Sequence, residues 1–107
     1  MDKYNNLEKA RKRYIPMSET MFYILFSLKQ ERHGYAIMQY VKELTKGRII
    51  LGAGTVYSSL GKLESDGLIG SAREEERRKI YAITPLGSEI LHEEIARITE
   101  LYNNVKE

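Results

Sequence analysis

The sequence predicts a mainly helical α+β fold with one β-hairpin. Apolar residues recur at helical spacing in most segments of the chain. Residues 68–84 instead have strand composition on both sides of a charged tip. Residues 85–106 then form one long amphipathic stretch. The 107 residues are enough for one domain with a modest core.

The segment 52–67 predicts a short helix with two different faces. Val56, Leu60 and Leu63 follow the spacing of a buried stripe. The other face carries hydroxyls and one cation, on Thr55, Ser58, Ser59 and Lys62. Because this face has no carboxylate, it suits a surface that meets a polyanion. We expect the Thr55 hydroxyl to cap the start of the helix.

Two helices and a short strand are expected before this segment. Ser18 begins a largely buried helix that continues to Lys29, and His33 is expected to be a turn or capping residue. A third helix runs over 35–46. Residues 48–51, Arg-Ile-Ile-Leu, have the composition of one strand.

The N-terminal residues 2–14 predict a polar helix that Pro16 ends. Its cations can contact phosphates, or they can form a solvated face or a flexible arm. The cations are Lys9, Arg11, Lys12 and Arg13.

The hairpin predicted over 68–84 carries charges of both signs. Arg77, Arg78 and Lys79 can follow a nucleic-acid backbone or enter a minor groove. Glu74, Glu75 and Glu76 at the tip argue against deep insertion.

The last predicted helix begins at Thr84-Pro85, with Thr84 as N-cap. Its apolar residues follow a heptad-like 4, 3, 4, 3 spacing, at Leu91, Ile95, Ile98, Tyr102 and Val105. This seam is longer than the domain's own core needs. We therefore expect a second copy of the chain to cover it.

The predicted order, helix, helix, strand, helix, hairpin, is that of a winged helix-turn-helix, with an extra N-terminal helix and a long C-terminal dimerisation helix. In a winged helix the third core helix lies in the major groove of DNA, which places segment 52–67 in the recognition position. The Tyr57 hydroxyl, one turn from the polar face, can bind a phosphate. We expect three units: an N-terminal helix or arm (1–16), a DNA-binding domain (17–84) and a dimerisation helix (85–107).

Other functional classes find little support. The Gly52-Ala-Gly54 turn suggests a dinucleotide site, but the third small residue of that fingerprint is replaced by Tyr57. No nucleophile–base pair, cofactor motif or metal spacing is present, so we expect neither an enzyme nor a cofactor. A winged-helix protein-interaction module without DNA binding is the alternative.

The charge balance agrees with a nucleic-acid partner for the body of the chain. Residues 1–83 hold 15 Lys and Arg against 10 Asp and Glu, whereas residues 84–107 hold 2 against 5. No apolar run approaches the length of a membrane span, and no secretory signal is expected. With no cysteine, a cytoplasmic setting is the default expectation.

Together these residues resemble the PadR family of transcriptional regulators. The matching text includes Thr20-Met-Phe-Tyr-Ile-Leu25, His33-Gly-Tyr-Ala-Ile-Met38 and Gly52-Ala-Gly-Thr-Val-Tyr-Ser-Ser-Leu60. It continues with Leu63-Glu-Ser-Asp-Gly-Leu-Ile69, Arg77-Arg-Lys-Ile-Tyr-Ala-Ile-Thr84 and Pro85-Leu-Gly87. The resemblance covers about residues 17–106.

The resemblance implies a repressor of the short type that binds an inverted-repeat double-stranded DNA operator as a homodimer. It places five residues of the recognition helix in the groove: Thr55, Tyr57, Ser58, Ser59 and Lys62. It also places Arg77, Arg78 and Lys79 on the wing, and Tyr35 at the start of the helix that crosses the backbone. It also implies release by a small aromatic or drug-like effector. Some short relatives stack flat ligands between tryptophans, and this chain has no Trp.

Overall fold

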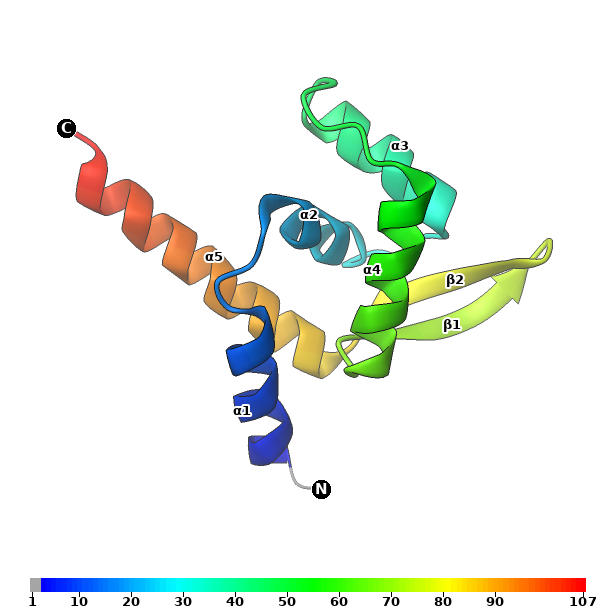
Figure 1. The fold of residues 1–107 in the computed structure, drawn as a ribbon, viewed down its shortest axis with the longest axis horizontal. Coiled ribbons are helices and arrows are strands. Elements are labelled where there is room, and N and C mark those ends of the chain that lie inside the picture. The colour runs from blue at the N-terminus through cyan, green and yellow to red at the C-terminus, as the bar shows by residue number, and fades with distance from the viewer. Residues whose placement is uncertain (1–2) are drawn as a thin grey trace.

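The computed structural model describes residues 3–107, and the side chains of residues 6–107. These residues form five helices and one hairpin, which projects from the helical body (Figure 1). The helices are α1 (Lys3–Tyr14), α2 (Glu19–Ser27), α3 (Gly34–Leu44), α4 (Ala53–Ser65) and α5 (Pro85–Val105), and the strands are β1 (Ile69–Glu75) and β2 (Arg78–Ile83). The predicted mainly helical winged-helix fold is confirmed.

Three helices begin at the polar residues that the sequence indicated. Ser18 Oγ accepts a hydrogen bond from Met21 N at 3.1 Å, at the start of α2. His33 Nδ1 accepts one from Ala36 N at 3.1 Å, at the start of α3. Thr84 caps α5 in the same way, with Pro85 as the first helical residue.

The expected cap at Thr55 is wrong. The N-cap of α4 is Gly52, which makes no side-chain cap. The Gly52 carbonyl accepts from Val56 N at 3.1 Å, so helical geometry starts before Thr55 and leaves its side chain within the first turn. At the other end, Gly67 has a φ of +82°, which confirms its left-handed conformation after the helix.

The expected strand over residues 48–51 is also wrong. This segment is irregular, with Leu51 buried and Ile50 exposed. The edge of β2 is taken instead by the connection between α2 and α3, because Arg32 and Tyr81 exchange backbone hydrogen bonds of 3.1 and 2.9 Å. Ile83 N also donates to Leu28 O at 2.9 Å. The outer edge of β2 is therefore already paired, and residues 48–51 do not form a third strand.

The hairpin is antiparallel, from the pair Ile69–Ile83 to the pair Glu75–Arg78, with an irregularity between Ser71 and Arg73. Glu76 and Arg77 form its two-residue turn, with φ values of 50° and 68°. Two residues with positive φ are typical of a type I′ turn, which matches the twist of the strands.

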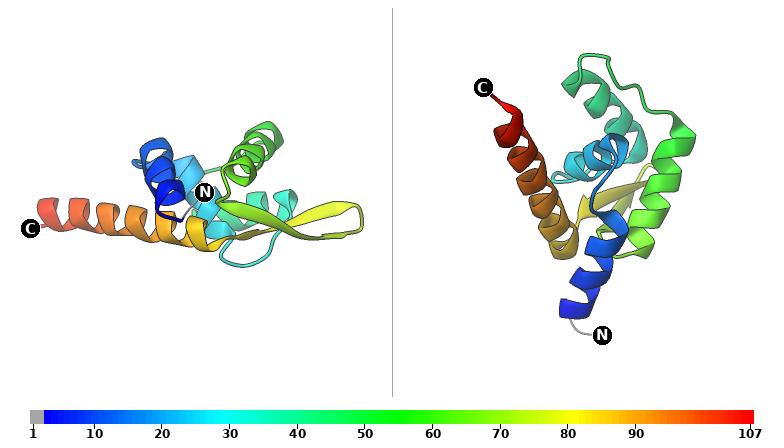
Figure 2. Two further views of the ribbon diagram at one scale, coloured as in Figure 1. Left: turned by 90° about the horizontal axis from the view of Figure 1, so that it is seen from below. Right: turned by 60° about the vertical axis from the view of Figure 1, so that its left-hand side comes forward.

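The core lies where all five helices and the base of the hairpin meet. Val56, Leu60 and Leu63 are at most 1% exposed, which confirms the buried stripe of α4. The wing and the C-terminal half of α5 project in opposite directions from this core (Figure 2). The molecule is correspondingly flat, at 48 × 41 × 20 Å. None of the helices in residues 3–107 has the length and apolar character that a bilayer crossing requires.

Candidate nucleic-acid interface

The outer face of α4 carries three of the predicted site residues. Thr55, Ser58 and Lys62 are exposed and lie three and four residues apart, which places them on one side of the helix. Ser59 is half-buried beside them. The helix therefore brings two hydroxyls and one cation together on its solvent side.

This face is polar, low in relief and free of carboxylates. The Thr55 and Ser58 hydroxyls make no side-chain hydrogen bond within the described part of the chain. Cβ atoms built on Gly54 and Gly61 would meet nothing within 4 Å. Glu64, the one acidic residue of α4, is half-buried. Another surface can therefore approach the backbone of α4 closely without meeting a negative charge.

Tyr57 points toward α3 rather than along this face. A Cβ atom added to Gly34 would lie 2.6 Å from the Tyr57 ring and hydroxyl, so the ring lies against the first residue of α3. Tyr57 remains 53% exposed. Tyr57 thus lies where α3 and α4 contact each other, and part of its ring faces solvent.

Lys62 lies at the end of α4 that contacts α1. Its Nζ is 5.6 Å from the centre of the Tyr14 ring. The Tyr14 hydroxyl donates to Asp66 at 2.6 Å, and Arg13 forms an ion pair with the same carboxylate at 2.6 Å. Burial and the Asp66 carboxylate raise the pKa of Tyr14. Lys62 therefore borders the N-terminal helix.

The basic cluster of α1 is part of the folded body rather than a flexible arm. Arg11 binds Glu93 of α5 through Nε at 2.9 Å and Nη2 at 2.9 Å. Ala10 and Tyr14 are buried. The sequence indicated the helix but contained no signal for its partners, because ion pairs between distant segments leave no local pattern.

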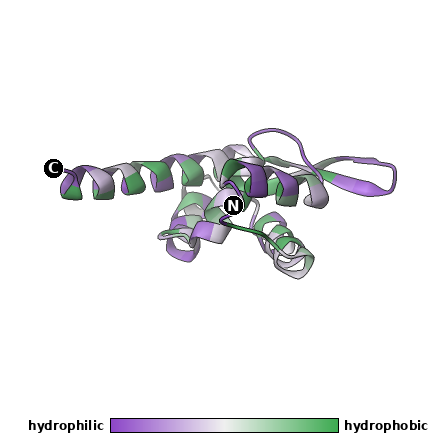
Figure 3. Ribbon diagram, turned by 90° about the horizontal axis from the view of Figure 1, so that it is seen from above, coloured by the Kyte–Doolittle hydropathy of each residue, from purple (hydrophilic) through white to green (hydrophobic). Residues whose placement is uncertain are grey.

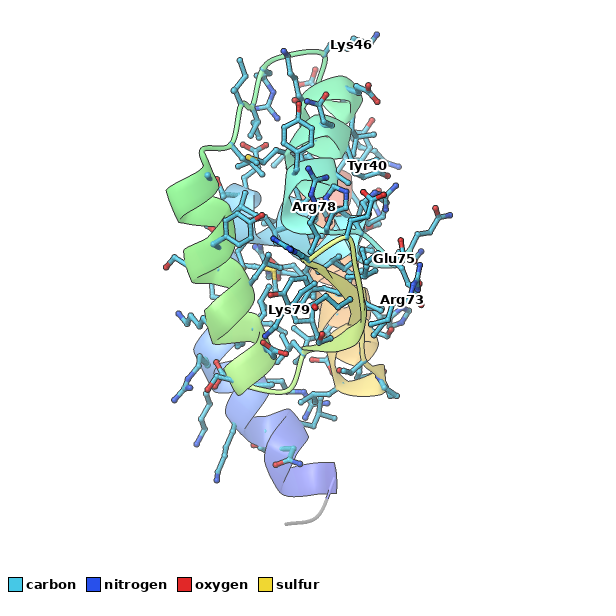
Figure 4. The ribbon with its side chains drawn as sticks, turned by 90° about the vertical axis from the view of Figure 1, so that its right-hand side faces the viewer. Tyr40, Lys46, Arg73, Glu75, Arg78 and Lys79 are labelled. Atoms are coloured by element: carbon cyan, nitrogen blue, oxygen red, sulfur yellow. The ribbon has the colours of Figure 1, made fainter. Side chains whose placement is uncertain are left out.

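The wing, which is the β1–β2 hairpin, carries cations that pair with carboxylates and cations that do not. Arg73 binds both Glu75 and Glu31, and Arg73 and Glu75 lie together on the side of the wing away from α4 (Figure 4). Among the described residues, no carboxylate pairs with Arg77, Arg78 or Lys79. All three are exposed, so the predicted cations are available to an anionic partner.

Tyr35 lies near the start of α3 and is 53% exposed. Its hydroxyl accepts a hydrogen bond from Gln39 Nε2 at 2.9 Å. The hydroxyl proton therefore remains available to an acceptor outside the chain.

The predicted seam of α5 is divided between the core and the surface. Leu91 is buried in the chain's own core, whereas Ile95, Ile98, Tyr102 and Val105 are exposed. Leu101 is exposed as well, at 51%, and the heptad-like spacing missed it although it lies three residues after Ile98. Hydrophobic residues recur along the projecting part of the helix, as the hydropathy colouring of the ribbon shows (Figure 3).

Comparison with known proteins gives consistent matches. The model of the transcriptional regulator PadR-like family matches residues 23–93. A PadR-like transcription factor from Bacteroides fragilis is 29% identical, with a TM-score of 0.70 over 94% of this chain and 95% of that chain. Bacillus subtilis PadR in complex with operator DNA is 28% identical, with a TM-score of 0.64 over 71% of this chain and 46% of that chain.

Curated relatives are longer than this chain. The transcriptional regulator YqjI of Escherichia coli K12 is 28% identical over 97 residues, which are 90% of this chain and 47% of that protein. A 37.1 kDa protein of a Streptomyces fradiae transposon is 33% identical over 75 residues, 21% of its length. The chain thus spans less than half of these relatives.

The family model covers most of the chain, and the winged-helix fold agrees with it. The family consists of transcriptional regulators rather than enzymes. The chain belongs to the PadR-like family of transcriptional regulators.

Proposed function

We propose that this DNA-binding transcriptional regulator occupies an inverted-repeat operator as a homodimer and represses transcription in the cytoplasm. The observation that carries the proposal is the outer face of α4, which is exposed, carboxylate-free and able to approach a groove closely. In the proposed complex Thr55, Ser58 and Lys62 face the major groove. Residues 17–84 are the DNA-binding unit and residues 85–107 the dimerisation helix.

The wing supplies the phosphate contacts in this proposal. Arg77, Arg78 and Lys79 have no carboxylate partner within residues 6–107, so binding DNA does not require breaking an ion pair. The exposed residues Ile95, Ile98, Leu101, Tyr102 and Val105 are the surface that a second copy covers. One short helix reads few bases, so specificity comes from two copies at a fixed spacing.

A small aromatic effector completes the proposal. A groove of about 380 Å³ lies between α2 and α5, and its apolar residues are Met17, Phe22, Tyr23, Ile95 and Ile98. Its volume is that of a small-molecule site. Because Ile95 and Ile98 belong both to this groove and to the proposed dimer surface, a ligand there would contact the dimer surface itself and could alter the distance between the two recognition helices.

The wing offers a matched pair of variants to test this function. Duplexes are first selected from a random library by the wild-type protein, and affinity is measured by fluorescence anisotropy across a salt series. We expect Arg77→Ala to weaken binding by about 1–2 kcal/mol and to reduce the salt slope by roughly one for each phosphate that is no longer neutralised. Arg73→Ala, whose side chain is held by glutamates, should change little. Failure to select any duplex would favour a protein-interaction module.

A further inference from the structure

We propose that His33 and Arg78 together bind one phosphate of the DNA backbone, at the junction of α3 and the wing. The inference rests on the proposed DNA-binding function and adds His33 to it. The sequence assigned His33 a capping role alone.

The two side chains converge from different elements. Arg78 begins β2, and His33 is the N-cap of α3. Arg78 Nη1 lies 3.3 Å from His33 Nε2, and Arg78 lies across α3 when the molecule is viewed from the wing (Figure 4). This separation is within hydrogen-bond range if one nitrogen donates and the other accepts.

The cap of α3 fixes the hydrogen-bonding role of each nitrogen. His33 Nδ1 accepts from Ala36 N at 3.1 Å, so Nδ1 carries no proton. The imidazole therefore carries its proton on Nε2, which becomes a donor. Arginine nitrogens are donors only. Two donors thus meet at the same place, and they cannot satisfy each other.

No acceptor within the described residues resolves this arrangement. Glu75 is opposite Arg78 in the strand register, but its carboxylate binds Arg73 Nε at 2.5 Å. Glu31 binds Arg73 as well. The guanidinium of Arg78 pairs with no carboxylate among residues 6–107. An anionic oxygen placed between His33 and Arg78 would accept from both.

The surroundings suit a phosphodiester. The His33 and Tyr35 rings lie nearly parallel, with centroids 6.5 Å apart, and the Tyr35 hydroxyl keeps a free proton because it accepts from Gln39. The Tyr57 ring lies against Gly34, which is the residue between His33 and Tyr35 in the sequence. The pair is therefore bordered by aromatic rings and further hydroxyl donors. It lies at the junction of α3 and the wing, and α4 reaches the same place through Tyr57.

The variant His33→Ser distinguishes the proposed role of His33 as a hydrogen-bond donor to phosphate from its role as the cap of α3. His33→Ser keeps an oxygen that can cap α3 but removes the second donor, whereas His33→Ala removes both. On a duplex selected by the wild-type protein, we expect both variants to weaken binding about tenfold. Only His33→Ala should also lower the thermal midpoint. His92→Ser, at the other histidine, which is exposed on α5, is the matched control and should bind like wild type.

Sharing of one phosphate predicts strong coupling. His33→Ser should cost little when Arg78 is already Ala, because the two groups act on the same oxygen. Neutral methylphosphonates are placed at each backbone position of the duplex in turn. At one position the substitution should weaken binding by the wild-type protein and erase the difference in affinity between wild type and His33→Ser.

Two results would overturn the inference in different ways. Wild-type affinity for His33→Ser, with only His33→Ala altered and only in stability, would leave His33 as a cap alone. If the wild-type protein enriched no duplex, the proposed DNA binding would fail, and with it the proposed phosphate site of His33 and Arg78.

Discussion

At the scale of single residues, close contacts decide which positions tolerate change. Gly34 has no room for a side chain, because an added Cβ would lie 2.6 Å from the Tyr57 ring. Gly61 lies within α4 with open space around it. The two positions hold the same residue type, but an added side chain meets a neighbour at Gly34 and open space at Gly61.

We expect Gly34→Ala to destabilise the fold by about 1 kcal/mol, the low end of the cost of overpacking, because the Tyr57 ring must move but is half exposed. Gly61→Ala should instead stabilise it by roughly 0.5–1 kcal/mol, since alanine favours a helix interior. Urea unfolding of both variants measures the difference. Equal effects of the two substitutions would contradict the packing of Tyr57 on Gly34.

Glu94 is the one fully buried carboxylate among the described residues. It binds Arg97 through two contacts of 2.8 Å and accepts from Met17 N at 2.8 Å. The Arg97 guanidinium and the Met17 N–H hold the pKa of Glu94 below its usual value, against the opposing effect of burial. The carboxylate thereby ties α5 to the start of α2.

The lowered pKa of Glu94 gives a pH dependence with a defined sign. Because the folded-state pKa lies below the unfolded one, this contribution is complete above about pH 4.5 and is lost as the pH falls through the folded-state value. We expect Glu94→Gln to cost about 1–3 kcal/mol at pH 7 and progressively less below pH 4.5. Chemical denaturation across pH checks this, and a difference that grows on acidification would contradict it.

At the scale of elements, α1 connects two parts of the molecule with different proposed roles. Arg11 binds Glu93 on α5, while Arg13 and Tyr14 bind Asp66 at the end of α4. The N-terminal helix therefore links the proposed dimerisation helix to the proposed recognition helix.

Removing the Tyr14 hydroxyl tests this link. We expect Tyr14→Phe to lower the free energy of unfolding by about 0.5–1.5 kcal/mol, through loss of the hydrogen bond to Asp66. The effect should vanish in an Asp66→Ala background, which a double-mutant cycle measures. Additive effects would mean that the two side chains do not interact.

Local patterns predicted most elements, and contacts between distant segments explain the failures. The helices, the hairpin, the buried face of α4 and the caps at Ser18, His33 and Thr84 each have a signal within a few residues. The edge of β2 is taken by Arg32, which has no strand signal of its own. Whether residues 48–51 pair as a strand depends on that edge, so their composition could not decide it.

In the candidate site, too, features with a local sequence pattern were predictable and contacts between distant segments were not. Exposure of Thr55 and Ser58 follows from helical spacing, and so it was predictable. The contact of Tyr57 with Gly34 and the pairing of Arg73 with Glu31 depend on the tertiary fold. The sequence therefore predicted which residues are exposed, whereas these two contacts became visible only in the fold.

At the scale of the whole molecule, the C-terminal half of α5, which carries the exposed apolar residues, projects away from the core (Figure 1). We expect Ile98→Glu to convert the proposed dimer to a monomer in sedimentation velocity, because it places a charge in the middle of the seam. Ile50→Glu adds the same charge at another exposed isoleucine and should leave the dimer intact. A wild-type monomer at micromolar concentration would contradict the proposed assembly.

In the proposed complex the outer face of α4 binds DNA, and one added charge on that face tests this binding. Ser58→Asp places a carboxylate on that face, while Ser88→Asp places one on the exposed side of α5. Affinity for a duplex selected by the wild-type protein should fall roughly tenfold or more for Ser58→Asp, through repulsion by the phosphates, and should stay near wild type for Ser88→Asp. Equal affinity of the two variants would contradict the account.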